Sequence, residues 1–175
     1  MALPLAETLK LKRFINDLAS HKALHTEFVS VYVPKDYDLT KIINHLAQEQ
    51  GTASNIKSAS TRKNVVAALE RMVQHLRTIN KTPPNGLAIF SGNVAAREGK
   101  QDLRVWSLEP PLPLNIRLYR CDKNFVTDVL EEKGITGKGQ FVEGEEFQEE
   151  QEVKEYKGAK DETGTKAGKM REVVG

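Results

Sequence analysis

The stretch that decides the fold is Gly51-Thr52-Ala53-Ser54-Asn55-Ile56-Lys57-Ser58, which lies between two segments of helical periodicity. Most of these residues are small or carry hydrogen-bonding groups, and they surround one isolated cation, Lys57. A loop of this composition presents backbone amides and hydroxyl groups around a single point charge. We call residues 51–58 the tip, and we expect it to enter a narrow polar site.

Upstream of the tip, apolar residues recur at the spacing of one helix face and predict a helix from about Asp38 to Glu49. These residues are Leu39, Ile42, Ile43, Leu46 and Ala47. Asp38 is suited to cap the start of this helix. We expect Gly51 to end it, because glycine enters the left-handed C-cap conformation at little cost.

Downstream of the tip, a second apolar stripe predicts a helix of about five turns over residues 60–79. Its members are Val65, Leu69, Met72, Leu76 and Ile79. Either Ser58 or Ser60 would cap its start, and Pro83-Pro84 lie beyond its end. Two antiparallel helices therefore present the tip at one end of the molecule.

The rest of the chain predicts a mixed α and β structure. Helical periodicity appears in Glu7–Ala19 and from Phe125 to Leu130, and strands are expected at Glu27–Val33, Leu87–Phe90, Leu103–Leu108 and Asn115–Cys121. We therefore expect an α+β fold, with a sheet of about four strands, helices packed on the sheet, and the helical hairpin projecting beyond it.

The last of these strands carries its own geometry, because side chains alternate across a sheet. Tyr119 and Cys121 share one face of the strand, and Leu118 lies on the other. Phe125 is expected in the core and could fold back toward Cys121. If the face with Tyr119 looks toward the hairpin, these side chains line a groove beside the tip.

Composition divides the chain near residue 132. Residues 1–132 carry 18 Lys and Arg against 14 Asp and Glu, whereas residues 133–175 carry 8 against 10 and hold 8 of the 12 glycines. We expect a domain at 1–132 and a flexible charged tail at 133–175, with a fraying helix at Glu143–Tyr156. One cysteine and no membrane-length apolar run favour a soluble intracellular protein.

Two motifs resemble a known family. Asn55-Ile56-Lys57-Ser58 is the hallmark tetrapeptide of the first domain of class-1 peptide chain release factors of archaea and eukaryotes. Tyr119, Cys121 and Phe125 match that family's Tyr-x-Cys-x-x-x-Phe motif at the expected distance downstream. The resemblance covers the chain from about Glu7 to Leu130. It implies a cytoplasmic protein that reads stop codons in the ribosomal decoding site.

The resemblance also implies roles for individual residues at the codon. Asn55 and Lys57 would address the uridine, and Ile56 would anchor the loop. Glu49, with Tyr119 beside it, would accept a hydrogen bond from a purine amine. The alternative is that Glu49 is only an exposed carboxylate at a helix end. The remaining contacts and surfaces are assigned to Gly51, Thr52, Ser54, Ser58 and Cys121, and Arg62 is assigned to the RNA backbone.

A third family element, Gly-Thr-Glu in its archaeal form, corresponds to His25-Thr26-Glu27. Thr26 and Glu27 match that form and are assigned to the same site. Histidine replaces the glycine, which would cost free energy if the loop needs a positive φ there. The four histidines (His21, His25, His45 and His75) are scattered, and we expect them at the surface and without a metal.

No catalytic constellation is recognisable in the sequence. The family releases the nascent peptide through a Gly-Gly-Gln loop in a following domain, and the nearest string here is Gly137-Lys138-Gly139-Gln140. We therefore expect no enzymatic activity, cofactor or metal. The resemblance implies the messenger and small-subunit ribosomal RNA as partners, a translational GTPase for the full-length form, and no membrane contact.

Two functions stay open at this point. One is the codon-reading domain of a translation terminator, and the other is an RNA- or ribosome-binding module of the same fold with a regulatory role. Two origins stay open as well, because the chain reads either as a shortened release factor with an unrelated tail or as a naturally short relative.

Overall fold

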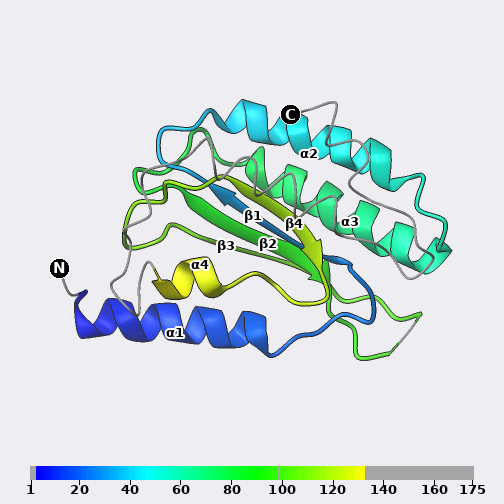
Figure 1. The fold of residues 1–175 in the computed structure, drawn as a ribbon, viewed down its shortest axis with the longest axis horizontal. Helices are drawn as coiled ribbons and strands as arrows, with labels where there is room; N and C mark the ends of the chain where they lie inside the picture. Colours follow the sequence, from blue (N-terminus) through cyan, green and yellow to red (C-terminus); the bar gives the residue numbers. More distant parts are fainter. Residues whose placement is uncertain (1–2, 98, 133–175) are drawn as a thin grey trace.

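The computed structural model describes residues 3–97 and 99–132. Within them the chain forms an α+β fold, as predicted, around a four-stranded antiparallel sheet of order β3-β2-β1-β4 (Figure 1). The elements are α1 (Leu5–Ala19), β1 (Phe28–Val33), α2 (Leu39–Ala53), α3 (Ala59–Leu76), β2 (Leu87–Asn93), β3 (Leu103–Leu108), β4 (Leu118–Asp122) and α4 (Asp128–Leu130).

The predicted tail lies outside the described residues, together with its Glu143–Tyr156 helix and its Gly137-Lys138-Gly139-Gln140 loop. The division of the chain at residue 132 therefore stays a prediction. Within the described residues, the predicted helices and strands are present, with ends that differ by a few residues. Helix α2 ends at Ala53 instead of Glu49, β4 begins three residues late, and α4 is only three residues long.

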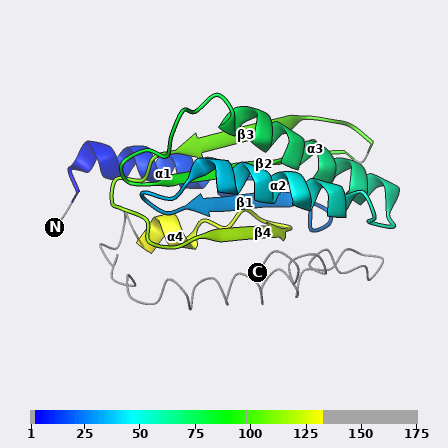
Figure 2. The ribbon, with the colours of Figure 1, turned by 90° about the horizontal axis from the view of Figure 1, so that it is seen from above.

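Helices cover both faces of the sheet. Helices α1 and α4 lie on one face, and α2 and α3 lie on the other (Figure 1). Seen from above, α3 lies over β2 and α2 lies over β1 (Figure 2). Two hydrophobic clusters result, one between the sheet and the α2–α3 hairpin and one between the sheet and α1.

Strand β1 pairs with β2 on one side and with β4 on the other, and all six of its residues are buried. Val29, Val31 and Val33 belong to the cluster under the hairpin, whereas Phe28 and Tyr32 belong to the cluster under α1. Alternation along the strand therefore supplies large side chains to both layers. A strand covered on both faces needs apolar residues at nearly every position, as Phe28–Val33 has.

Gly51 does not end α2, contrary to the sequence-based expectation. The helix continues to Ala53, and Ser54 caps it in the right-handed α conformation. Among the described residues, positive φ values occur at Asp36, Gly86 and Gly99. The apolar stripe explains the extension, because Ala53 and Ile56 continue it and both are buried under the hairpin.

We expect Gly51→Ala to raise the free energy of unfolding by about 0.5–1 kcal/mol, because alanine restricts the unfolded chain and favours helix. A Cβ atom at Gly51 would have no other atom within 4 Å. Urea denaturation followed by circular dichroism measures the change.

Gly86→Ala is the matched control for that substitution. Gly86 has a φ of +90°, and an added Cβ would lie 2.4 Å from the backbone oxygen of Val33. This variant should lose at least about 1–2 kcal/mol. A loss of stability in both variants would contradict the helical state of Gly51.

Candidate nucleic-acid interface

The tip is a compact turn between two capped helices. The Ser58 Oγ accepts a hydrogen bond from the Thr61 N–H at 3.3 Å and caps α3, so Ser58 rather than Ser60 fills this role. At the end of α2, the Asn55 N–H donates to the Thr52 carbonyl at 3.0 Å. The Ser54 hydroxyl donates to the Gly51 carbonyl at 2.6 Å. The backbone of the tip is therefore fixed by its own hydrogen bonds.

Ile56 and Arg62 hold the tip against the rest of the molecule. The Ile56 side chain is 3% exposed and packs in the cluster under the hairpin, so it is buried as expected. The Arg62 guanidinium donates from Nη1 to the Ile56 carbonyl at 2.8 Å. Arg62 thus closes the base of the tip from within the chain, a role that the sequence did not indicate.

The anchored tip directs its polar side chains outward. Ser54, Asn55 and Lys57 are exposed, whereas Thr52 is half-buried and donates from its hydroxyl to the Gln48 carbonyl at 3.2 Å. Asn55 and Lys57 flank the buried Ile56 in sequence. An apolar anchor between an exposed amide and an exposed ammonium presents both groups at defined positions on the surface.

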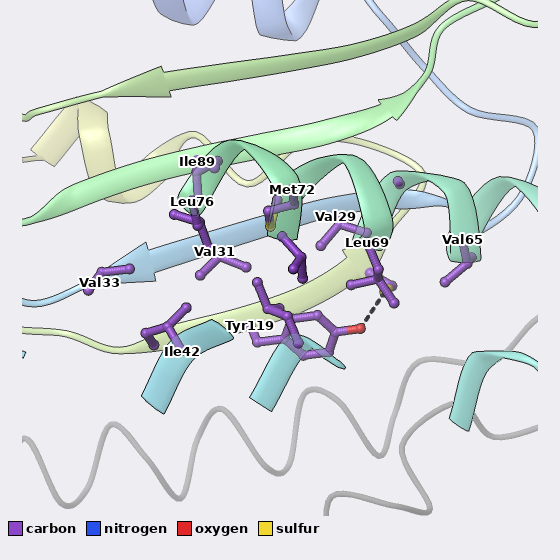
Figure 3. Close-up of a cluster of buried hydrophobic side chains, with 14 of the residues drawn as sticks. Val29, Val31, Val33, Ile42, Val65, Leu69, Met72, Leu76, Ile89 and Tyr119 are labelled. Carbon is purple, nitrogen blue, oxygen red and sulfur yellow. Dashed lines mark hydrogen bonds between the residues drawn. The ribbon is translucent and has the colours of Figure 1, made fainter. Parts of the chain in front are cut away.

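On β4, Tyr119 and Cys121 share one face, as predicted, and this face looks toward the α2–α3 hairpin. The Tyr119 hydroxyl and the Cys121 Sγ lie 3.2 Å apart and share a hydrogen bond (Figure 3). Leu118 lies in the opposite cluster, under α1.

Glu49 and His45 complete this arrangement from α2. Glu49 has no exposed surface, and its Oε2 lies 3.8 Å from the His45 Nε2. The His45 ring lies 5.5 Å from the Tyr119 ring, centroid to centroid. We call His45, Glu49, Tyr119 and Cys121 the buried polar cluster.

Two expectations about these residues are wrong. Glu49 is not an exposed carboxylate at a helix end, and His45 is not a surface residue. The spacing could have revealed both, because Glu49 follows His45 by four positions and thus lies one turn above it. Glu49 also lies three positions after Leu46 and four before Ala53, on the apolar stripe.

A third expectation is also wrong: Tyr119 and Cys121 do not line an open groove beside the tip. Tyr119 is 2% exposed and Cys121 is 4% exposed, since both pack in the hydrophobic layer between the sheet and the hairpin. The sequence correctly predicted that the two side chains share a face, but not how deeply they are buried. In this conformation, Asn55 and Lys57 are accessible, whereas the buried polar cluster is covered.

Burial raises the pKa of the Cys121 thiol to about 12, while the Tyr119 hydrogen bond opposes the rise and the carboxylate of Glu49 adds to it. The thiol therefore stays protonated at neutral pH. A protonated and buried thiol is a poor nucleophile, so Cys121 contributes shape and a weak hydrogen bond.

The native chain should accordingly resist thiol reagents at pH 8, where an ordinary thiol is partly ionised. Cys121 is the one cysteine of the chain, so Ellman's reagent reports on it alone. We expect prompt labelling only after unfolding in guanidinium chloride. Equal labelling rates of the folded and unfolded chains would contradict the buried position.

The stretch His25-Thr26-Glu27 leads into β1 at the same end of the sheet as the tip. Its turn is closed by a hydrogen bond from the Glu27 N–H to the His25 carbonyl at 2.8 Å. Thr26 is half-buried and Glu27 is buried. His25 is not among the residues with positive φ, so the replacement of glycine by histidine costs no backbone strain there.

Phe125 lies on the other side of the sheet from Cys121. Its ring stacks on Phe28 with centroids 4.2 Å apart and contacts the Trp106 and Phe90 rings at their edges. Its place in the core confirms the prediction. It does not fold back toward Cys121, and it takes no part in the surface around the tip.

Comparison with known proteins settles the family. Residues 6–133 match the family model described as eRF1 domain 1, which covers most of the chain. The chain belongs to the eRF1 domain 1 family. The matched residues include the tip and the buried polar cluster.

This eRF1 domain 1 chain is similar to release factors of several archaea. The peptide chain release factor subunit 1 of Thermococcus kodakarensis is 54% identical over 127 residues, covering 73% of this chain and 31% of that protein. The corresponding protein of Thermoplasma acidophilum is 37% identical over 132 residues. A solved structure of an archaeal translation termination factor, aRF1, is 34% identical with a TM-score of 0.64, covering 71% of this chain and 34% of that one. The chain spans about a third of the length of these relatives.

Two further observations concern residues 3–97 and 99–132 of this eRF1 domain 1 chain. They contain no group of three or more His, Cys, Asp and Glu side chains arranged to bind a metal ion. None of their helices is both long and apolar enough to cross a membrane.

Proposed function

We propose that this chain reads stop codons in the ribosomal decoding site during translation termination. The observation that carries the proposal is the anchored tip, with exposed Asn55 and Lys57 on either side of the buried Ile56. Membership of the eRF1 domain 1 family and similarity to archaeal release factors support it.

The chemistry of the tip suits an unpaired base. Sequence-specific RNA recognition mostly targets single-stranded nucleotides through stacking and hydrogen bonds to base edges. The Lys57 ammonium has three donors, and the Asn55 amide both donates and accepts. A uracil edge offers carbonyl acceptors and an imide donor, so these two side chains could contact uridine without moving their backbone.

We assign recognition of the second and third codon bases, the purines, to the buried polar cluster. Unlike Asn55 and Lys57, this cluster is not accessible. Glu49, Tyr119 and Cys121 are covered in this conformation, so a direct contact with purines requires α2 and β4 to separate locally. We propose that codon binding drives this opening. The carboxylate of Glu49 would then accept a hydrogen bond from a purine amine.

The same burial favours a second candidate function. A domain that exposes Asn55 and Lys57 but keeps Glu49 and Tyr119 covered would bind the decoding site without reading the purines. Such a domain would be a regulatory module that competes for the site and does not direct release. The covered state of the buried polar cluster is the observation in its favour.

The partners follow from the first proposal. The chain would contact the messenger and the small-subunit ribosomal RNA in the cytoplasm, and its full-length form would act with a translational GTPase. Hydrolysis of peptidyl-tRNA is assigned to a separate catalytic part, and Thr26 and Glu27 to the codon side of the interface.

The test is the affinity of the intact chain for ribosomes programmed with a stop or a sense codon. Codon reading predicts tighter binding to each stop-programmed ribosome at the same salt concentration. Equal affinity for both kinds of ribosome would overturn it and support the regulatory candidate. Absence of binding to either would overturn both.

A further inference from the structure

A second concave surface lies at the same end of the molecule as the tip. The α1–β1 loop and the β2–β3 connection reach the end of the sheet where the tip projects (Figures 1 and 2). Together with the first turns of α3 they enclose a cavity of about 350 Å³. No residue of the tip lines this cavity, and neither does the buried polar cluster.

Four cations from three segments of the chain line this cavity, which we call the cationic cavity. They are Lys22 from the α1–β1 loop, Lys63 from α3, and Arg97 and Lys100 from the β2–β3 connection. Among the described lining residues, Glu27 is the one carboxylate. All four cations are exposed, and none forms an ion pair within residues 3–97 and 99–132.

The wall of the cavity is held in place by Asn93 at the end of β2. Its Nδ2 donates to the Asn64 Oδ1 on α3 at 3.1 Å and to the Lys100 carbonyl at 3.0 Å. Its Oδ1 accepts from the N–H groups of Ala95 and Asp102 at 3.1 and 2.9 Å. The two ends of the β2–β3 connection are therefore held together and to α3, and the backbone at Lys100 is organised before any ligand arrives.

Such an arrangement suits a ligand with several separated negative charges. A polynucleotide presents one phosphate per nucleotide, so it can offer a separate negative charge to each of several cations. Lysine acts on phosphate as a point charge and tolerates varied geometry. Lys63 lies five residues after Ser58, about 7–8 Å along the axis of α3, so one RNA could meet both surfaces.

We propose that the cationic cavity binds the sugar-phosphate backbone of single-stranded RNA, independently of its sequence. The proposal rests on the proposed function, to which it adds a contact that contributes affinity without codon discrimination. The RNA would be either the messenger beside the codon or an unpaired segment of ribosomal RNA.

The test compares the full chain carrying Lys63→Gln and Arg97→Gln with the matched control Lys12→Gln and Arg13→Gln. The control removes the same two charges from exposed positions on α1, across the sheet from the hairpin. The cavity variant should bind programmed ribosomes at least about tenfold more weakly, and its salt dependence (the slope of log K against log salt) should fall by about 1–2. The control should change affinity less than about twofold.

The two sources of RNA are separated by shortening the messenger so that it ends at the codon. If the cavity variant no longer loses affinity when the messenger is shortened, the contact is with the messenger. If the loss of affinity persists, the contact is with ribosomal RNA. Equal losses in the cavity and control variants would overturn the proposal, as would no loss in either.

A failure of the proposed function and a failure of the RNA-binding proposal give different results. The cavity variant should lose affinity for stop- and sense-programmed ribosomes by the same factor, so the ratio between the two affinities reports on codon reading and not on the cationic cavity. If the intact chain binds no ribosome, anisotropy with a short labelled single-stranded RNA at low salt decides the proposal. Unchanged binding of that RNA by the cavity variant would overturn it.

Discussion

Lys57→Ala should bind stop-programmed ribosomes no better than sense-programmed ones. The Lys57 ammonium is exposed on a tip whose backbone is fixed by Ile56 and Arg62. A hydrogen bond to a charged group contributes about 1.5–3 kcal/mol, so its loss should reduce affinity for the stop codon by roughly 10- to 150-fold. Equilibrium binding at one fixed salt concentration measures both ribosomes side by side.

The control is Lys35→Ala, which removes the same charge from an exposed position between β1 and α2, at the other end of the sheet. This variant should keep the ratio of stop to sense affinity. Both variants should unfold at the urea concentration of the parent chain, because neither side chain is buried. A Lys57→Ala chain that keeps its stop preference would remove Lys57 from codon reading.

Ile56→Ala should have the largest effect on stability among the substitutions at the tip. The Ile56 side chain is almost fully buried in the cluster under the hairpin. Truncating a buried isoleucine to alanine costs about 2–5 kcal/mol, a large share of the roughly 5–15 kcal/mol that stabilises a typical domain. Urea denaturation followed by circular dichroism measures the loss.

Ile56→Val separates packing from function. It should cost only about 0.5–1.5 kcal/mol and keep the stop preference, because most of the anchor remains. Ile56→Ala should lose the preference even under conditions in which the chain is folded, since the tip then lacks its apolar attachment. Full codon preference in folded Ile56→Ala would show that the hydrogen bonds of the tip suffice to fix it.

Most of the scaffold could be predicted from periodicity, because each element has one consistent pattern. The two helices around the tip, β1 and β3 show this most clearly. Gly51 is the instructive exception. Glycine favours a helix end, but one more helical turn buries Ala53 and Ile56. This tertiary packing outweighs the cost of about 1 kcal/mol for placing a glycine inside a helix.

The candidate site was predicted less completely, for a different reason. Alternation along β4 showed which side chains share a face, but not how closely α2 would approach them. The depth of Glu49 and Tyr119 depends on the packing of α2 against β4, which no local pattern encodes. The contact between Arg62 and the Ile56 carbonyl was likewise missed, because it joins a side chain to a backbone oxygen six residues away.

The position of β1 at the centre of the sheet has a consequence for synthesis of the chain. Its last neighbour, β4, is among the final elements described, and the Ser30 hydroxyl accepts from the Val126 N–H, 96 residues further along. Pairing across such a separation closes a long loop, which slows folding. A nascent chain that has exposed only α1 to β3 outside the exit tunnel therefore holds an incomplete sheet, with one edge of β1 open until residue 122 emerges.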